Sequence, residues 1–596
     1  MTDPLLIPEL LKGYRSGRFT PALLMERLLE AAERAEPRNV WITRLPRDQV
    51  MRYVKALDSR SIEASPLYGI PFVIKDNIDL AGVPTTAGCP AFAYTPTRSA
   101  TVVERLLQAG AIPLGKTNLD QFATGLVGTR SPYGACRNSF DSDFISGGSS
   151  SGSAVAVATG LASFGLGTDT AGSGRVPAAF NNVVGLKPSL GRLSTRGVVP
   201  ACRTLDCVSI FSLTADDAGR VLEIAGGFDA EDPFSRRLGH ASLRGARFGV
   251  PRRGQLEFFG DSAYAQLFDA TVGRCEDLGG LPVEIDFAPF IEAARLLYEG
   301  AWIAERYAAV GRFIDAHPDA AFPVTAQIIR GGRNPSAVEA YETQYRLKAL
   351  QRAGEAAWAA VDWILTPTAG TIYSIAAVDA DPIRLNSALG YYTNFMNLFD
   401  LAGVAVPAGF RADGLPFGVT LIGPARSERD LLTRGEALHR ACDNTLGATG
   451  LVRPAPPSPA TPRLAPGDVR LVVCGAHMQG LPLHGQLLER GAYLLERTLT
   501  APGYRLFALP GGPPHRPGLV RVSKAGGAVE VEVYGIPPEH LGSLLAAIPA
   551  PLGIGQVELR DGSSAPGFLC EAYASVDAAD ITAHGGWRAY VTEARL

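Results

Sequence analysis

The sequence predicts an α/β fold, with a mixed and mostly parallel β-sheet covered by helices, followed by a smaller α+β domain. The first observation is an alternation of segments: a strand-like apolar run at 71–75, an amphipathic helical pattern at 100–110 and a second strand-like run at 111–116. Strands that alternate with helices are typical of a largely parallel sheet. The second observation is a stretch at 453–467 with six prolines in fifteen residues, which we interpret as an extended linker between two domains.

The composition is that of a globular protein with ample material for a core, since 46% of the 596 residues are hydrophobic and 19% are charged. A net charge of −3 gives no reason to expect a nucleic acid or an anionic membrane as partner. Neither a membrane span nor a signal peptide is expected, because no apolar run has the necessary length or flanks. The eight cysteines lack a C-x-x-C pair, so we expect reduced thiols, a cytoplasmic protein and no metal site.

Two helices are expected at the start of the chain. Apolar residues recur at helical spacing over 5–35, and the pattern is interrupted at Gly17–Pro21. The apolar strand that follows at 71–75 ends in Lys75. Burial would lower the pKa of this lysine, although a neutral amine at pH 7 costs about 4–5 kcal/mol relative to an unperturbed pKa of about 10.4.

A serine- and glycine-rich stretch at 146–179 is the centre of the predicted chemistry. Hydroxyls alternate with glycines over 146–153, small apolar residues follow at 154–161, and a second glycine-rich turn covers 167–173. The small apolar run predicts a closely packed buried helix, which a flexible Gly/Ser linker would not contain. Successive backbone N–H groups in such turns form a concavity that stabilises negative charge. Serines placed there point to nucleophilic catalysis with an oxyanion hole.

Lys75 is a better candidate than any histidine for the base that activates a serine. The first histidine of the chain is His240, although a distant imidazole could still reach the serines in space. Residues 148–152 match G-x-S-x-G, so an α/β-hydrolase elbow at Ser150 is an alternative. A loop-like segment precedes this motif where the elbow needs a buried strand, and a Ser-Lys pair is therefore favoured.

These segments together resemble the amidase signature family, through PFVIKDNID at 71–79, GGSSSGSAVAV at 147–157 and GLGTDTAGSGRVPAA at 165–179. The resemblance implies an amidase-signature sheet and a Ser-cisSer-Lys triad, with Ser173 as nucleophile, Ser149 as bridging serine and Lys75 as base. It also implies an oxyanion hole made by the amides of four consecutive residues: Thr170, Ala171, Gly172 and Ser173. The chain departs from many relatives at Ser151 and Ala171, where they have glycine, and neither change removes a required group.

Charged residues flank this turn. Asp169 and Arg175 lie on either side of Ser173, and we interpret them as charges that fix the loop. In the polar loop at 117–134, Gly125 is either a close-approach point for substrate or a packing glycine.

Residues 289–310 are predicted to form one strongly helical segment. Tyr298 and Arg306 would lie about 80° apart around a helix that turns roughly 100° per residue. A guanidinium is well suited to bind a carboxylate, although an ordinary amphipathic helix would show the same residues. The chain resembles the allophanate hydrolases of the amidase signature family here, and in NLDQFATGLVGTRSPYG at 118–134. That resemblance implies that Tyr298 and Arg306 bind the substrate carboxylate.

The segment after the linker is long enough for an independent core. It contains an apolar run at 469–474, an alternating V-E-V-E-V at 529–533, a helical pattern at 538–548 and a hairpin signal at Asp561-Gly562. An α+β domain is therefore expected. His477 follows the first strand between glycines, where a histidine is more often structural than functional.

The segment around His477 also resembles the C-terminal domain of allophanate hydrolases, through LGIGQVELRDG, GFLCEAY and DITAHGGWRAYV. That resemblance implies a catalytic role for His477 on the product of the first step. The expected domains are 1–450, a linker at 451–467, and 468–596.

The reaction implied is hydrolysis of allophanate, urea-1-carboxylate, to ammonia and CO2, with the C-terminal domain acting on N-carboxycarbamate. We expect a homodimer with a small-molecule substrate, and the chemistry needs no metal or organic cofactor. Two alternatives stay open. The chain could be a general amidase or the amidase subunit of an amidotransferase, and residues 468–596 could be a binding or dimerisation module without chemistry.

Overall fold

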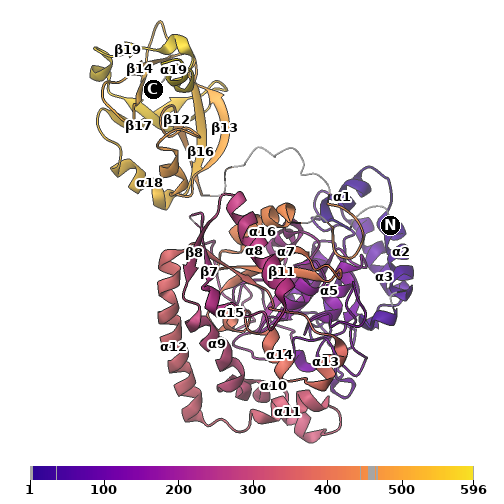
Figure 1. The fold of residues 1–596 in the computed structure, drawn as a ribbon. Helices are drawn as coiled ribbons and strands as arrows, with labels where there is room; N and C mark the ends of the chain where they lie inside the picture. Colours follow the sequence, from indigo (N-terminus) through magenta and orange to yellow (C-terminus); the bar gives the residue numbers. More distant parts are fainter. Residues whose placement is uncertain are drawn as a thin grey trace. The chain divides into compact units, whose positions relative to one another are not determined.

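The computed structural model describes residues 5–34, 36–243, 245–442, 445–453, 464 and 467–594. The chain divides into two compact units, one of Met1–Ala241 and Ala246–Arg453 and one of Ser242–Gly245 and Pro454–Leu596 (Figure 1). Most of the predicted linker at 451–467 lies outside the described residues. The predicted domain boundaries therefore stay predictions.

The first unit is built on a mixed sheet, which within the described residues has 11 strands. In sheet order these are β1 (Trp41–Arg44), β3 (Ile112–Thr117), β2 (Pro71–Lys75), β4 (Phe164–Asp169), β6 (Cys207–Ser212), β5 (Val184–Lys187), β10 (Ala402–Phe410), β11 (Pro416–Gly423), β9 (Trp363–Pro367), β7 (Arg247–Pro251) and β8 (Leu281–Ile285). β2 is parallel to both β3 and β4, whereas β4 and β6 are antiparallel. The predicted α/β class with a mixed sheet is confirmed. The expectation of a mostly parallel sheet is wrong, because six of the ten neighbouring strand pairs among the described residues are antiparallel, and β10 and β11 follow each other along the chain as an antiparallel pair.

Helices cover this sheet. They are α1 (Ile7–Arg15), α2 (Pro21–Arg34), α3 (Arg47–Lys55), α4 (Thr101–Gln108), α5 (Ser151–Ala158), α6 (Val176–Phe180), α7 (Ala215–Ala225), α8 (Ser262–Asp277), α9 (Ala288–Glu299), α10 (Trp302–Ala316), α11 (Pro323–Gly331), α12 (Ala337–Ala360), α13 (Ile375–Ala380), α14 (Arg384–Leu389), α15 (Phe395–Leu398) and α16 (Glu428–Ala441). The two predicted N-terminal helices are confirmed as α1 and α2. α5 is buried along its whole length, as its small apolar residues predict.

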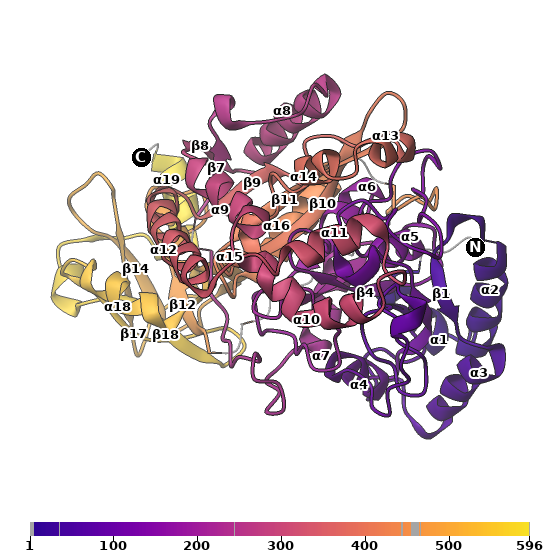
Figure 2. The ribbon, with the colours of Figure 1, turned by 90° about the horizontal axis from the view of Figure 1, so that it is seen from below.

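The single helix predicted over 289–310 is wrong. α9 ends at Glu299, and α10 begins at Trp302 after a break at Gly300, whose ψ of −172° is extended. A Cβ at Gly300 would lie 2.6 Å from the carbonyl oxygen of Leu296 and 2.7 Å from Cγ2 of Thr343 on α12. Glycine is thus required where α9 meets α12. These two helices lie side by side in Figures 1 and 2.

A hydrophobic cluster lies between the sheet and these helices. It contains Ala171 from the glycine-rich turn, Phe290 and Leu297 from α9, and Tyr392 and Phe395. The partly buried Tyr298 and Trp302 pack against the same cluster. The core of the first unit therefore connects the predicted nucleophile turn directly to the ends of α9 and α10.

The second unit is an α+β domain, as predicted. Its five-stranded sheet has the order β13 (Tyr493–Leu499), β16 (Glu530–Ile536), β12 (Val469–Val473), β18 (Ser564–Cys570) and β17 (Leu552–Glu558) within the described residues. A smaller sheet contains β15 (Pro517–Arg521), β14 (Tyr504–Ala508) and β19 (Ala579–Asp580), and the helices are α17 (His484–Leu488), α18 (Pro538–Ala546) and α19 (Trp587–Ala594). β17 and β18 form the hairpin predicted around Asp561-Gly562.

None of the helices in the described part of the chain is both long enough and apolar enough to span a membrane.

Candidate active site

Lys75 lies at the carboxyl end of β2 with its side chain fully buried. Its Nζ is 2.7 Å from Oγ of Ser149 and 2.8 Å from Oγ1 of Thr168, which belongs to the neighbouring parallel strand β4. Burial lowers the pKa of Lys75 to about 7, against the opposing effect of nearby carboxylates. The amine can therefore lose its proton near neutral pH, as a general base must.

Ser149 lies just before α5, and the peptide bond that joins it to Gly148 is cis. Its hydroxyl is buried and contacts Lys75. Its neighbour Ser150 is also buried, and the Ser150 hydroxyl donates to the carbonyl of Thr168 at 3.1 Å. Ser150 is thus held by the backbone of β4 and does not stand exposed at the tip of a strand. The hydrolase elbow at Ser150 is therefore wrong.

The turn that carries Ser173 connects β4 to α6 and is held by Asp169. The Asp169 carboxylate accepts hydrogen bonds from the amides of Gly172 at 2.9 Å and Gly174 at 3.0 Å, and from Arg175 Nε at 2.9 Å and Nη2 at 3.0 Å. Burial alone would raise the pKa of Asp169, but Arg175 holds it below its usual value. The interpretation of Asp169 and Arg175 as charges that fix the loop is confirmed.

Ser173 itself is 3% exposed, and its hydroxyl forms no hydrogen bond with another described residue. It follows the strand whose Thr168 contacts Lys75. The structure thus brings Lys75 and Ser149 into direct contact, while Ser173 lies on the adjoining turn.

The backbone donors of this turn are not equivalent. Among the described residues, the amides of Thr170, Ala171 and Ser173 have no acceptor, whereas the Gly172 amide donates to Asp169. Three of the four N–H groups proposed for the oxyanion hole are therefore available. Gly172 has a φ of +144°, which glycine tolerates best, and a Cβ there would lie 2.5 Å from Oγ1 of Thr393.

Tyr298 and Arg306 come together although they lie on different helices. The guanidinium carbon of Arg306 lies 5.4 Å from the centre of the Tyr298 ring, a distance typical of a cation–π contact. Arg306 is 2% exposed, its Nη1 donates to Oγ1 of Thr124 at 3.3 Å, and its Nε has no partner among the described residues. A buried guanidinium with an unused donor can bind an anion such as a carboxylate.

Gly125 has a φ of +158°, and a Cβ at this position would lie 2.7 Å from Oδ2 of Asp120. The space beside it is therefore filled by protein. Of the two roles considered for Gly125, this contact favours packing.

Three polar residues near the site were not predicted. Thr168 contacts Lys75, Thr124 contacts Arg306, and Asp206 lies buried just before β6. Thr168 could have been inferred, because it stands at the end of the strand that leads to the predicted nucleophile. Asp206 had no such signal, since it is a single carboxylate in a stretch without a motif.

His477 belongs to the second unit, where it lines a cavity of about 430 Å³ together with Gln486, Arg516, Leu544 and Phe568. Its Nε2 lies 3.1 Å from Oε1 of Gln486, and its ring stacks on Phe568 with the ring centres 4.9 Å apart. Burial lowers the pKa of His477. Nε of Arg516 is buried without a partner among the described residues.

Comparison with known families matches both units. A family model described as Amidase matches residues 24–432, and one described as Allophanate hydrolase C-terminal domain matches residues 469–592. The solved structure of allophanate hydrolase from Kluyveromyces lactis is 39% identical, with a TM-score of 0.90, and the match covers 99% of each chain.

Two sequence relatives differ in the share of their own length that this chain covers. The urea amidolyase of Saccharomyces cerevisiae is 44% identical over 589 residues, which is 95% of this chain and 32% of that protein, so the chain spans about a third of the relative's length. A glutamyl-tRNA(Gln) amidotransferase subunit from Symbiobacterium thermophilum is 34% identical over 70% of this chain and 93% of its own.

Proposed function

The chain belongs to the amidase family, and on that premise we propose that it hydrolyses allophanate to ammonia and CO2. The observation that carries this proposal is the buried guanidinium of Arg306 over Tyr298, in the same unit as the buried Lys75–Ser149 pair. The first arrangement suits a substrate with a carboxylate, and the second suits amide hydrolysis. The likeness to an allophanate hydrolase along both units supports the same substrate.

The proposed reaction begins with proton transfer. Neutral Lys75 accepts the proton of Ser149, which in turn accepts the proton of Ser173. Ser173 Oγ then forms a bond to the terminal carbamoyl carbon of allophanate. The 2.7 Å separation of Lys75 Nζ and Ser149 Oγ supports the first of these transfers.

The negative charge on the carbonyl oxygen is stabilised by backbone amides. Thr170, Ala171 and Ser173 are the preferred donors because their N–H groups have no acceptor among the described residues. Loss of one such donor typically costs on the order of 3–4 kcal/mol. The C–N bond then breaks, the proton returns through Ser149 to the nitrogen, and ammonia leaves. Water hydrolyses the acyl-enzyme to N-carboxycarbamate.

We propose that the second unit removes CO2 from N-carboxycarbamate. Its cavity of about 430 Å³ offers the imidazole of His477 and Nε of Arg516, which has no partner in the part of the chain that the structure describes. The permanent positive charge of Arg516 suits an anionic compound, and a cavity of this size accommodates one.

A general amidase, or the amidase subunit of an amidotransferase, is the second candidate. The likeness to the amidotransferase subunit favours it for the first unit. In this case the second unit would bind a partner or a second copy without chemistry.

The deciding experiment measures ammonia release from allophanate and from simple uncharged amides. We expect allophanate to be preferred, and Ser173→Ala to abolish turnover. Arg306→Ala should reduce kcat/KM for allophanate by about 100-fold, the value of a charge-assisted contact of roughly 3 kcal/mol, and should not affect uncharged amides. Arg312→Ala is the matched control, because Arg312 is an exposed arginine on the same helix. Unchanged turnover of allophanate by Arg306→Ala would show that the substrate assignment is wrong.

We also infer a cytoplasmic homodimer that acts in urea degradation. Among the described residues none of the eight cysteines forms a disulfide, and all eight are buried, which supports a reducing compartment. Val338, Tyr341 and Tyr345 lie on one face of α12 and are 66%, 59% and 69% exposed, which supports an apolar contact with a second copy. Sedimentation of the wild type and of Tyr345→Glu tests the dimer, which the variant should weaken.

A further inference from the structure

The turn that carries Ser173 is held by a second buried carboxylate besides Asp169. Asp206 accepts a hydrogen bond at Oδ1 from the Thr170 hydroxyl at 2.5 Å. Its two oxygens also accept from the amides of Ala201 at 2.8 Å and Cys202 at 3.2 Å. No ion pair joins Asp206 to another described residue, in contrast to the Asp169–Arg175 pair.

The sheet register explains this contact. β4 and β6 are antiparallel, and Asp169 is opposite Cys207. One step further along, Thr170 leaves β4 at the point where Asp206 precedes β6, so the two side chains meet at the same edge of the sheet. Asp206 therefore approaches the first half of the turn, whereas Asp169 binds the amides of its second half, at Gly172 and Gly174.

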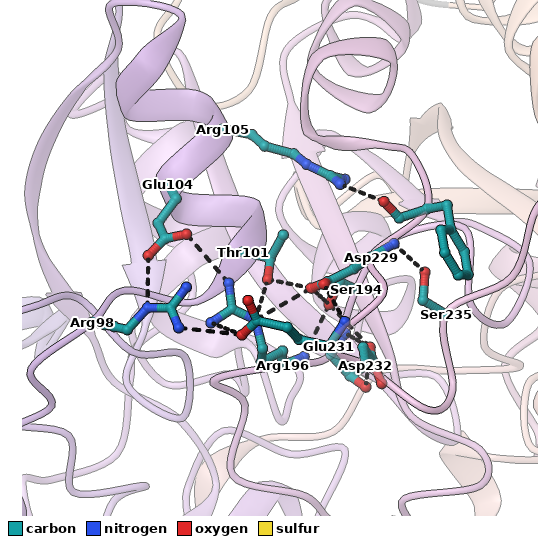
Figure 3. Close-up of polar contacts among 12 residues, drawn as sticks. Arg98, Thr101, Glu104, Arg105, Ser194, Arg196, Asp229, Glu231, Asp232 and Ser235 are labelled. Atoms are coloured by element: carbon teal, nitrogen blue, oxygen red, sulfur yellow. Dashed lines mark hydrogen bonds and ion pairs between the residues drawn. The ribbon is translucent and has the colours of Figure 1, made fainter.

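Asp206 also lines a cavity of about 130 Å³. Arg196, Glu231 and Asp232 line the same cavity, and Figure 3 shows them within a polar network. There Arg196 Nε donates to Asp229 Oδ2 at 3.3 Å, and its Nη2 donates to Glu104 Oε2 at 3.3 Å. The network fixes Arg196, which lines the cavity together with Asp206. Among the described residues, the Asp206 side chain has the three hydrogen bonds named above.

We propose that Asp206 is a positioning residue for amide hydrolysis, which through the hydroxyl of Thr170 aims the amides of Thr170 and Ala171 at the developing oxyanion. This inference rests on the proposed function. A displacement of an oxyanion donor by a few tenths of an ångström weakens the stabilisation of the transition state and leaves substrate binding largely unchanged. The expected signature is thus a loss in kcat with a nearly constant KM.

The test compares Asp206→Asn, Thr170→Val, Thr170→Ser and the double variant Asp206→Asn/Thr170→Val on allophanate. Asp206→Asn and Thr170→Val should each lower kcat about 10- to 100-fold with KM changed less than about threefold. The double variant should be no slower than the slower single variant, because both changes weaken or remove the same contact. Thr170→Ser keeps the hydroxyl and should retain kcat within about threefold of the wild type.

Glu231→Gln is the matched control, since Glu231 lines the same cavity without touching the turn. It should leave kcat within about twofold of the wild type. If Asp206→Asn does not fold, the kcat values of Thr170→Val and Thr170→Ser test the inference, because both variants keep the Asp206 carboxylate.

Three outcomes would overturn the inference: wild-type kcat in folded Thr170→Val, equal losses in Thr170→Val and Thr170→Ser, or additive losses in the double variant. If the wild type prefers a simple amide over allophanate, the proposed substrate is wrong, but the role of Asp206 can still be tested. The ratios of variant kcat to wild-type kcat are then measured on that amide. A wild type without turnover on either substrate would overturn both.

Discussion

Nζ of Lys75 lies 2.7 Å from Oγ of Ser149, and both side chains are fully buried. The second partner of the amine is the hydroxyl of Thr168, so neither direct contact carries a charge. Carboxylates act on the amine only at longer range, and burial is the larger effect on its pKa. This arrangement favours the neutral amine. Lys116 differs in its direct contacts, because its Nζ lies 3.1 Å from the charged Oδ1 of Asp76.

The first prediction concerns the pH dependence of catalysis. Since the pKa of Lys75 is lowered to about 7, kcat/KM should rise with pH through a midpoint near 7 and level off above it. At pH 5 kcat/KM should be roughly 100-fold below its plateau, because at a pH two units below its pKa an amine is only about 1% deprotonated. Hydrolysis rates from pH 5 to 9 test this, and a midpoint near 10 would contradict a buried neutral amine.

The same lowered pKa predicts a change in stability with pH. Between about pH 7 and 10.5 the unfolded chain keeps the proton of Lys75 while the folded chain has released it. The free energy of unfolding should therefore rise with pH over this range. Lys75→Met should flatten the rise. The thermal midpoint of the first unit is measured at pH 7 and at pH 9.5 for the wild type and for Lys75→Met. If the midpoint changes by the same amount in both proteins between these pH values, the prediction is wrong.

The third prediction separates the two units. His477→Ala should leave the release of the first ammonia unchanged and slow the release of CO2 about 10-fold or more, since the imidazole lines the cavity of the second unit. The control is His584→Ala, because His584 belongs to the same unit but lies beside Glu593. ¹³C NMR of the reaction should show N-carboxycarbamate accumulating only with His477→Ala. Parallel loss of both products would argue against separate steps.

The sequence predicted those parts of the site that depend on local motifs. Lys75 at the end of an apolar strand, and the hydroxyls beside glycines around 146–173, are visible in the chain because strand ends and glycine-rich turns have local signatures. The contact between Asp206 and Thr170 is not visible, since it depends on the register of β4 and β6. Strand register across a sheet is set by tertiary packing, which one sequence does not reveal.

The break between α9 and α10 is a second feature that depends on tertiary packing and could not be predicted from the sequence. The helical periodicity of residues 289–310 continues through Gly300, and glycine within a helix costs only about 1 kcal/mol relative to alanine. α9 ends where the backbone of Gly300 turns extended, and this position has no room for a Cβ because Thr343 from α12, 43 residues away in the sequence, lies against it. Tyr298 and Arg306 still meet, but across a bend and not along one helix face.

The last prediction concerns Gly300 at this bend. Gly300→Ala places a Cβ 2.6 Å from the Leu296 carbonyl oxygen and 2.7 Å from Cγ2 of Thr343. The first neighbour is backbone and cannot move alone, so α9 or α10 must shift. We expect destabilisation by about 1–3 kcal/mol, the usual cost of overpacking, and a rise in KM for allophanate, because Tyr298 and Arg306 lie on either side of the shift.

Gly273→Ala provides the matched control. Gly273 lies within α8, and a Cβ there has no neighbour within 4 Å. Because alanine is the better helix former, Gly273→Ala should raise the thermal midpoint of the first unit slightly and leave KM unchanged. Since the alanine side chain is the same in both variants, a lower midpoint and a higher KM in Gly300→Ala alone would identify the bend as the cause. Equal behaviour of the two variants would show that α9 and α10 can be joined without cost to the site.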